Sequence, residues 1–206
     1  MNTDLRKSHW EKVFQNNDTT KVSWYQPVPK TSLNLIQQLP IKKTARIIDI
    51  GAGDSFLADH LLKLHYSDIS LLDISEKALK TVKNRLGESS GKVSFFEKDV
   101  LQFETNQKFD VWHDRAVFHF FNQNEDIENY VQTVSKKINQ NGYLIIGTFS
   151  ENGPEKCSGL NVKRYTEKEL SGTFQKYFNK IECFKENHTT PSGSVQNFLF
   201  CVFQKK

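Results

Sequence analysis

The chain has 206 residues, which suits one domain, and 37% of them are hydrophobic, with 16 phenylalanines, so it can enclose a sizeable core and is not a disordered protein. Its formal net charge is only +4, from 28 Lys and Arg against 24 acids. The basic residues are scattered, with no basic run longer than two residues, which argues against a nucleic-acid partner. No apolar run approaches the ~18 residues that span a bilayer, and the polar start MNTDLRKSHWEKVF is no signal peptide, so we expect no membrane partner and a cytoplasmic protein.

The cysteines and histidines indicate no metal site. Cys157, Cys183 and Cys201 are an odd number at wide spacing, no Cys-x-x-Cys occurs, and no pair of histidines has the spacing of metal ligands. We therefore expect no bound metal. We also expect free thiols, which are typical of a reducing compartment such as the cytosol.

Helices and strands alternate along most of the chain. The pattern of apolar residues predicts helices in residues 4–15, 31–39, 55–64, 75–87 and 124–142, and strands in residues 45–50, 68–74, 92–100, 109–116 and 143–149. Ser75 is the expected cap of one helix, and Asp54 or Ser55 that of another. Two further apolar runs, 180–188 and 195–203, flank the turn sequence TTPSGS and predict an antiparallel hairpin.

This alternation predicts a three-layer, doubly wound, Rossmann-like α/β fold. Its sheet is expected to be mostly parallel, covered by helices on both faces, and to end in the antiparallel C-terminal hairpin. We expect a single domain over residues 1–206. Within it, residues 1–40 are predicted to form a helical cap or lid, and residues 41–206 the core.

The stretch IIDIGAGDS, residues 47–55, ends a predicted strand with an acid and two closely spaced glycines. Gly51 and Gly53 allow a tight turn and a close approach of the backbone to a ligand, although a purely structural turn explains them equally well. Asp73 ends the next strand, 22 residues after Gly51, where a carboxylate can accept both ribose hydroxyls. Glycine turn and acid together indicate an adenosine-containing cofactor.

The residues beside the glycine turn discriminate between such cofactors. A pyrophosphate favours a third small residue at the start of the following helix, and this chain has Phe56 there. Asp49 and Asp54 place negative charge beside the turn, which disfavours phosphate and suits an ammonium or sulfonium group. The turn therefore favours S-adenosylmethionine over NAD.

The motifs resemble those of class I S-adenosylmethionine-dependent methyltransferases from about residue 20 to the end. IIDIGAGDS resembles the family's first motif, with Ser55 where a third glycine is common, and LLDIS, EKDVLQF and FDVWHDRAVFHFF resemble its later motifs. With HWEKVF, VSWYQPVP and GPEKCSGLNVKRY, they look like a bacterial subfamily without an assigned substrate. The resemblance makes Asp73 the ribose ligand, Asp99 the partner of the adenine amino group and Val100 the donor of a backbone amide. The cofactor-binding set that it implies is Trp24, Tyr25, Asp49, Gly51, Ala52, Gly53, Asp73, Ile74, Asp99, Val100 and His113.

The segment WHDRAVFHFF follows the fourth core strand, at the end of the sheet where catalytic groups of such folds collect. We expect His113, Asp114 and Arg115 to meet the substrate and to orient it, with His113 or His119 as a general base. The alternative is that Asp114 and Arg115 only cap the next helix. The segment lacks the Pro-Pro-aromatic motif of enzymes that methylate planar amino groups, and the chain has no Pro-Cys, so nucleic acid is a poor candidate substrate.

Three functions stay open. The leading hypothesis is methyl transfer to a small molecule through sulfur, oxygen or nitrogen, in a pocket closed by an N-terminal lid and lined by Trp10, Phe14, Trp24, Tyr25, Phe118 and Phe121. A protein-lysine methyltransferase is the alternative, and a non-catalytic cofactor-binding regulator ranks last. A polar loop from Gly153 to Tyr165 is expected to face the substrate, with Cys157, Arg164 and Tyr165 as candidates. Roles for these residues and for His188 are left undecided.

Overall fold

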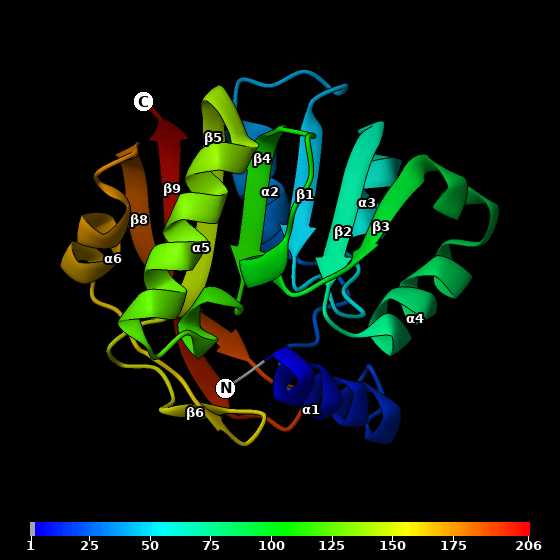
Figure 1. Cartoon of the computed structure of the whole chain (residues 1–206). Helices are drawn as coiled ribbons and strands as arrows, with labels where there is room; N and C mark the ends of the chain where they lie inside the picture. The colour runs from blue at the N-terminus through cyan, green and yellow to red at the C-terminus, as the bar shows by residue number, and fades with distance from the viewer. Residues whose placement is uncertain (1–2) are drawn as a thin grey trace.

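The computed structural model describes residues 3–206 and contains a seven-stranded sheet in the order β3-β2-β1-β4-β5-β9-β8 (Figure 1). Strands β1 to β5 pair in parallel, whereas β9 pairs antiparallel with both β5 and β8. The predicted α/β class with its antiparallel hairpin is therefore confirmed. Residues 1–2 of the predicted cap lie outside the described residues. The strands are β1 Arg46–Ile50, β2 Asp68–Asp73, β3 Val93–Glu97, β4 Phe109–Arg115, β5 Ile138–Phe149, β8 Phe178–Thr189 and β9 Val195–Lys205.

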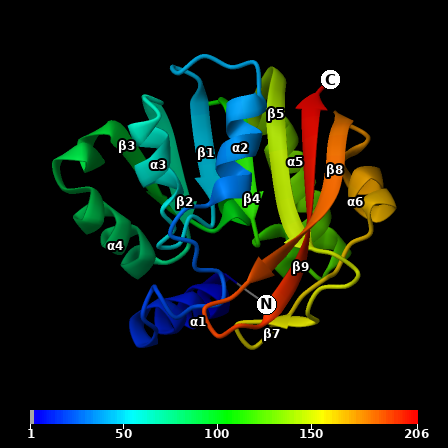
Figure 2. The same cartoon turned by 180° about the vertical axis from the view of Figure 1, so that it is seen from behind.

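Helices pack on both faces of the sheet because its central strands are apolar on both sides. One apolar cluster joins the sheet to α2, α3 and α4, and a second joins it to α5 and α6. Figure 1 shows α5 and α6 in front of the sheet, and Figure 2 shows α2 and α3 from the other side. No helix among residues 3–206 is long and apolar enough to cross a membrane, and the cytoplasmic location stays a prediction. The helices are α1 Thr3–Asn16, α2 Lys30–Gln38, α3 Leu57–Lys63, α4 Glu76–Leu86, α5 Asn124–Lys137 and α6 Glu167–Phe174.

Helix α1 lies across the edge of the sheet at which the parallel strands end (Figures 1 and 2). None of its residues from Thr3 to Asn16 is buried. The loops that follow β1, β2, β3 and β4 converge on the same edge, as they do in doubly wound sheets. A small hairpin of β6 (Lys156–Cys157) and β7 (Leu160–Asn161) follows β5. The fold thus places the glycine turn, the strand-end acids and the N-terminal helix together.

The helix predicted over residues 124–142 is too long, because α5 ends at Lys137 and β5 begins at Ile138. Ile138 fits the apolar spacing of the helix but is buried as the first residue of the strand. Asn141 has a φ of 62°, and the Asn-Gly pair that was expected to stop the helix lies within β5, where the pairing with β4 shifts register. Helix α6 was not predicted, although Thr166 and Glu169 form a capping box at its start.

The predicted caps are partly correct. The Ser75 hydroxyl accepts a hydrogen bond from the Ala78 amide at 3.2 Å and caps α4 as expected. The Ser55 hydroxyl accepts from the Leu57 amide at 3.1 Å. Asp54 does not cap α3, because its carboxylate accepts instead from the hydroxyl of Thr19.

The expectation of three free cysteines is wrong for two of them. Cys183 and Cys201 lie directly opposite each other on β8 and β9 and form a disulfide. Cys157 is free and buried. Eighteen residues separate the bonded pair, and the sequence does not give the register that brings them together.

Candidate active site

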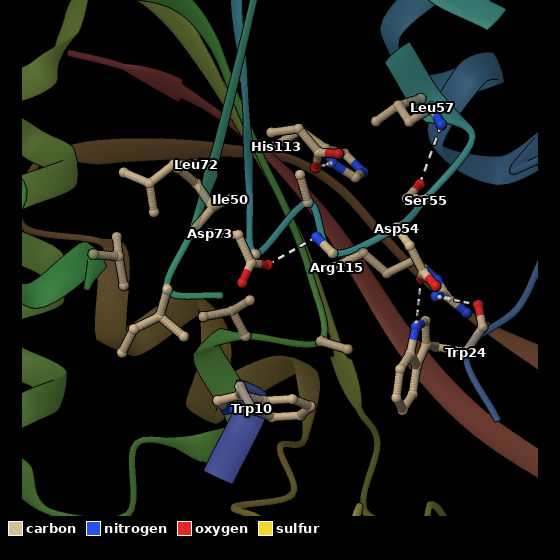
Figure 3. Close-up of a pocket in the computed structure, with 18 of the residues that line it drawn as sticks. Trp10, Trp24, Ile50, Asp54, Ser55, Leu57, Leu72, Asp73, His113 and Arg115 are labelled. Carbon is tan, nitrogen blue, oxygen red and sulfur yellow. Dashed lines mark hydrogen bonds and ion pairs between the residues drawn. The ribbon is translucent and has the colours of Figure 1, made fainter. Parts of the chain in front are cut away.

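The chain folds around a cavity at the carboxyl edge of the sheet (Figure 3). The glycine turn forms its floor, with positive φ at Gly51 (58°) and Gly53 (54°). A Cβ at Gly51 would stand 2.0 Å from Cγ2 of Val117, and one at Gly53 would stand 3.1 Å from the Phe14 ring. Both glycines are therefore required by conformation and by close packing. All the residues predicted to bind the cofactor line this cavity: Trp24, Tyr25, Asp49, Gly51, Ala52, Gly53, Asp73, Ile74, Asp99, Val100 and His113.

Asp73 ends β2 at the cavity wall and holds the turn in place. Its two carboxylate oxygens accept hydrogen bonds from the amides of Gly53 at 2.7 Å and Ser75 at 2.8 Å. Burial raises its pKa to about 6, and the hydrogen bonds from the two amides offset only part of that rise. A carboxylate in this position can also accept hydrogen bonds from the hydroxyl groups of a ligand, because each oxygen has two lone pairs.

Asp99 follows β3 and ties the N-terminal helix to the core. One of its oxygens accepts from the Arg6 side chain at 2.9 and 3.0 Å and from the Thr3 hydroxyl at 2.9 Å. Its other oxygen accepts from the Leu101 amide at 3.0 Å. The sequence did not indicate Arg6, which also lines the cavity. The carboxylate of Asp99 therefore joins the N-terminal helix to the wall of the cavity.

Aromatic rings from three parts of the chain form one side of the cavity. The Trp10 ring lies 5.2 Å from Phe120 and 6.2 Å from both Phe14 and Trp24, measured between ring centroids. The ring of Phe14 in turn lies 5.8 Å from that of Trp24. Tyr25 lines the cavity beside them. Of the predicted lid, residues 1–40, the part that carries Trp10, Phe14 and Trp24 lies over the glycine turn, whereas α2 packs against the sheet as part of the core. Phe120 is an aromatic residue that the sequence did not single out.

His113 occupies the centre of a buried chain of three side chains. Its Nδ1 lies 2.7 Å from Oδ1 of Asp49, and its Nε2 lies 2.8 Å from the hydroxyl of Ser32. A carboxylate accepts hydrogen bonds only, so Nδ1 carries a proton, and in the neutral ring Nε2 accepts the proton of the Ser32 hydroxyl. All three residues line the cavity. Ser32, on α2, did not stand out in the sequence.

Arg115 lies on the cavity wall next to Trp24 (Figure 3). Its Nη1 donates to the backbone carbonyl of Trp24 at 3.3 Å, and its guanidinium carbon stands 4.8 Å from the centre of the Phe198 ring. Its Nη2 is buried and has no hydrogen-bond partner. Burial lowers the pKa of this guanidinium to about 10. The side chain is therefore a cation at neutral pH.

Asp114 and His119 do not line the cavity. The structure therefore does not support the predicted contact of either residue with the substrate. The Asp114 carboxylate accepts from the Tyr130 hydroxyl at 2.5 Å and from the amides of Val117 and Phe118 at 3.0 and 3.3 Å. These two amides lie at the start of the short 3-10 helix Phe118–Phe120, as the helix-capping alternative expected of Asp114, but Arg115 lines the cavity instead. Burial lowers the pKa of His119 to about 3, and its Nδ1 accepts from the Phe149 amide. Successive side chains of β4 alternate between the two faces of the sheet, so Asp114 points away from the cavity that Arg115 lines.

The remaining candidates divide between the cavity and its surroundings. Phe121 and Cys157 line it, whereas Phe118 is buried against the ring of Tyr165. Arg164 pairs with Glu155 outside the lining, and Nε2 of His188 hydrogen-bonds the carbonyl of Ser23. Within residues 3–206, no cluster of three or more His, Cys, Asp and Glu side chains is arranged to hold a metal ion.

A family described as a methyltransferase domain matches residues 41–197, which is most of the chain and includes the glycine turn, Asp73 and Asp99. The chain belongs to the class I S-adenosylmethionine-dependent methyltransferases. The N-methyltransferase NodS from Bradyrhizobium japonicum, in complex with S-adenosyl-L-homocysteine, superposes with a TM-score of 0.75 over 96% of this chain and 98% of that chain. A methyltransferase from Anabaena variabilis gives 0.77 over 100% and 96%. At 15% and 16% identity, these likenesses show the fold alone.

Similar sequences belong to enzymes with different acceptors. The mouse eEF1A lysine and N-terminal methyltransferase is 37% identical over 98 residues, which are 47% of this chain and 14% of that protein. The malonyl-[acyl-carrier protein] O-methyltransferase of Acetivibrio thermocellus is 28% identical over 149 residues, 70% of this chain and 49% of that protein. The chain thus spans half or less of the length of these relatives, and their names do not decide its acceptor.

Proposed function

We propose that this chain transfers the methyl group of S-adenosylmethionine to a small-molecule acceptor. The observation that carries the proposal is the closure of the cavity by the N-terminal segment. Trp10 and Phe14 of α1, together with Trp24, cover the glycine turn and leave an aromatic-walled space at the end of β4. A cavity that is partly covered and mostly apolar, with a few polar groups, suits a small ligand better than a protein surface.

The cavity lining fits the proposed cofactor chemically. Four carboxylates line it, from Asp49, Asp54, Asp73 and Asp99. These charges disfavour a phosphate group and favour a ligand with an ammonium and a sulfonium. We assign the ribose hydroxyls to Asp73, the adenine amino group to Asp99, and the amino-acid end to the turn beside Asp49. The bound cofactor supplies an activated methyl group on sulfur.

The chain's own part in the reaction is to position the acceptor, exclude water and take up a proton. We propose that Nε2 of His113 receives the proton that an acceptor hydroxyl or amine releases, by way of the Ser32 hydroxyl. Asp49 then faces the resulting imidazolium at 2.7 Å and stabilises it. The aromatic rings of Trp10 and Trp24 shield the site from water. An acceptor that is already ionised, such as a thiolate, needs no such base.

A second candidate is methylation of a protein lysine or N-terminal amine. The relatives named as eEF1A lysine and N-terminal methyltransferases favour it, at 29–37% identity. In that case α1 would have to move aside, because Trp10 and Phe14 occupy the space above the turn through which a protein side chain would enter. The two candidates therefore differ in whether the closed arrangement of α1 is the working state.

One experiment separates these candidates. Purified protein is incubated with methyl-labelled cofactor and a cell extract, and the label is then measured in the low-molecular-mass fraction and in protein bands. The proposal expects label in small metabolites, with the Asp73→Ala variant as the control for cofactor-dependent transfer. Label confined to a discrete protein band would move the assignment to the lysine or N-terminal amine, and no transfer at all would leave a binding protein.

A further inference from the structure

Arg115 is a half-buried cation that lines the cavity without an ion-pair partner in the described part of the chain. Among residues 3–206 it forms no ion pair with any carboxylate, although ten pairs between Lys or Arg and a carboxylate occur elsewhere in this part of the chain. Its one hydrogen bond to the protein, from Nη1 to the Trp24 carbonyl, leaves Nη2 buried and unpaired. A buried polar atom without a hydrogen-bond partner costs free energy, and a ligand that supplied a partner to Nη2 would remove that cost.

The groups in direct contact with Arg115 are neutral, and the carboxylates that raise its pKa, those of Glu186 and Asp49, form no ion pair with it. Burial raises the pKa of the nearby Cys157 thiol, so this group does not supply a thiolate. The pKa of His188 is lowered by burial and by the Arg115 charge itself. Phe198 offers only the face of its ring. The guanidinium therefore has no carboxylate partner at contact distance among the described residues, and an anion that reached it in the cavity could form a charge-assisted pair with it.

We infer that Arg115 binds a carboxylate of the methyl acceptor, so that the substrate of this enzyme is a small carboxylic acid. The guanidinium presents a planar fork of donors that matches the two oxygens of a carboxylate. With Nη1 held by the Trp24 carbonyl, Nη2 is the terminal nitrogen that has no partner in the described part of the protein, and a small shift of the side chain would present it to a ligand. This inference rests on the proposed function and names its substrate class.

The position of Arg115 separates it from the part of the cavity assigned to the cofactor. Asp73 and Asp99 follow β2 and β3, which lie on one side of β1 in the sheet. Arg115 ends β4 on the other side, and its contacts are with Phe198 of β9 and the Trp24 carbonyl. An acceptor carboxylate anchored at Arg115 would therefore approach the centre of the cavity from the side opposite the adenosine.

The test uses the full chain saturated with S-adenosyl-L-homocysteine and measures tryptophan fluorescence, because Trp10 and Trp24 both line the cavity. Acetate is titrated as the carboxylate probe, and acetamide as its uncharged counterpart, at constant ionic strength. The variants are Arg115→Gln, Arg115→Lys to keep the charge in a fold-compatible form, and Arg164→Gln as the matched control. Arg164 pairs with Glu155 outside the cavity lining.

We expect saturable binding of acetate but not of acetamide, a loss of about tenfold or more in Arg115→Gln, partial retention in Arg115→Lys and no change in Arg164→Gln. Equal responses of the wild type and Arg115→Gln to acetate would overturn the inference. A matching loss of S-adenosyl-L-homocysteine affinity in Arg115→Gln would overturn it too, because the anion would then be the carboxylate of the cofactor. The titration needs no turnover, so its failure is distinguishable from a failure of the proposed methyl transfer.

Discussion

The two sides of the cavity are built on different principles. On the side of β1 to β3, every carboxylate that we assign to the cofactor already holds protein groups, as Asp73 does with two amides and Asp99 with Arg6. On the side of β4, Arg115 has a buried donor without any partner. The first side is held by its own hydrogen bonds, whereas on the second His113 is paired but Arg115 keeps one donor without a partner. This difference indicates where specificity for the acceptor would lie, because the unpartnered donor of Arg115 favours ligands that can accept a hydrogen bond from it.

The largest effect is expected for Gly51→Ala on the side of β1 to β3. The new Cβ would stand 2.0 Å from Val117, and the residue would keep a φ of 58° that side chains disfavour. Overpacking and strain together amount to roughly 2–5 kcal/mol, so we expect binding of S-adenosyl-L-homocysteine to be lost in calorimetry. Gly172→Ala is the control, because that glycine is exposed in α6 with open space around it. Retained affinity in Gly51→Ala would show that the turn does not approach the cofactor.

Deletion of residues 1–20 removes the N-terminal segment that covers the cavity. The helix contributes no buried residue, so we expect little change in the melting temperature. We expect turnover to fall by about a hundredfold, because Trp10 and Phe14 no longer exclude water and position the acceptor. Kinetics and thermal unfolding are measured on the same preparation. A protein acceptor predicts the reverse for turnover, since an opened cavity would then admit its substrate more easily.

The difference between the two sides also explains what the sequence could predict. The glycine turn and Asp73 were found because they are local patterns at the ends of apolar runs. Ser32 and Arg6 were missed because each acts on a residue far along the chain, 81 residues away for His113 and 93 for Asp99. No periodicity in the sequence reports such pairings.

The segment after β4 shows a second limit. Its position at the cavity edge was predicted correctly, and Arg115 and His113 do line the cavity. The direction of each side chain was not predictable, so Asp114 was assigned to the substrate although it caps a 3-10 helix. Sequence order gives the location of a strand end, but the register of the strand decides which neighbour faces the ligand.

An intermediate effect is expected for Asp73→Ala. Removal of a charged acceptor should weaken binding of S-adenosyl-L-homocysteine by about 1.5–3 kcal/mol, measured by calorimetry. Asp68→Ala, an exposed change at the start of the same strand, is the control. Because burial raises the pKa of Asp73 to about 6, affinity in the wild type should also decline as the pH falls through 6 and the carboxylate gains a proton. Unchanged affinity in Asp73→Ala would remove the ribose assignment.

The smallest effect is expected for Asp114→Asn, which should change stability and leave catalysis near normal. An asparagine offers one acceptor oxygen to the three donors that the carboxylate now satisfies, and we expect a loss of about 1–3 kcal/mol in unfolding free energy. Turnover should stay near that of the wild type, because Asp114 does not line the cavity. A selective loss of turnover at unchanged stability would instead return Asp114 to the substrate.

The pH dependence of the same variant gives a sharper test of this role. Burial raises the Asp114 pKa from 3.8 to about 6 in the folded protein, so between these values the folded state binds a proton that the unfolded state has lost. The contribution of this group to stability is therefore complete below pH 3.8 and is lost as the pH rises through 6. Asparagine does not titrate, so the variant's deficit relative to the wild type should shrink by about 1 kcal/mol between pH 5 and pH 7.5. Denaturant unfolding at the two pH values measures it, and a deficit that grows with pH would mean that the ionised carboxylate is the stabilising form.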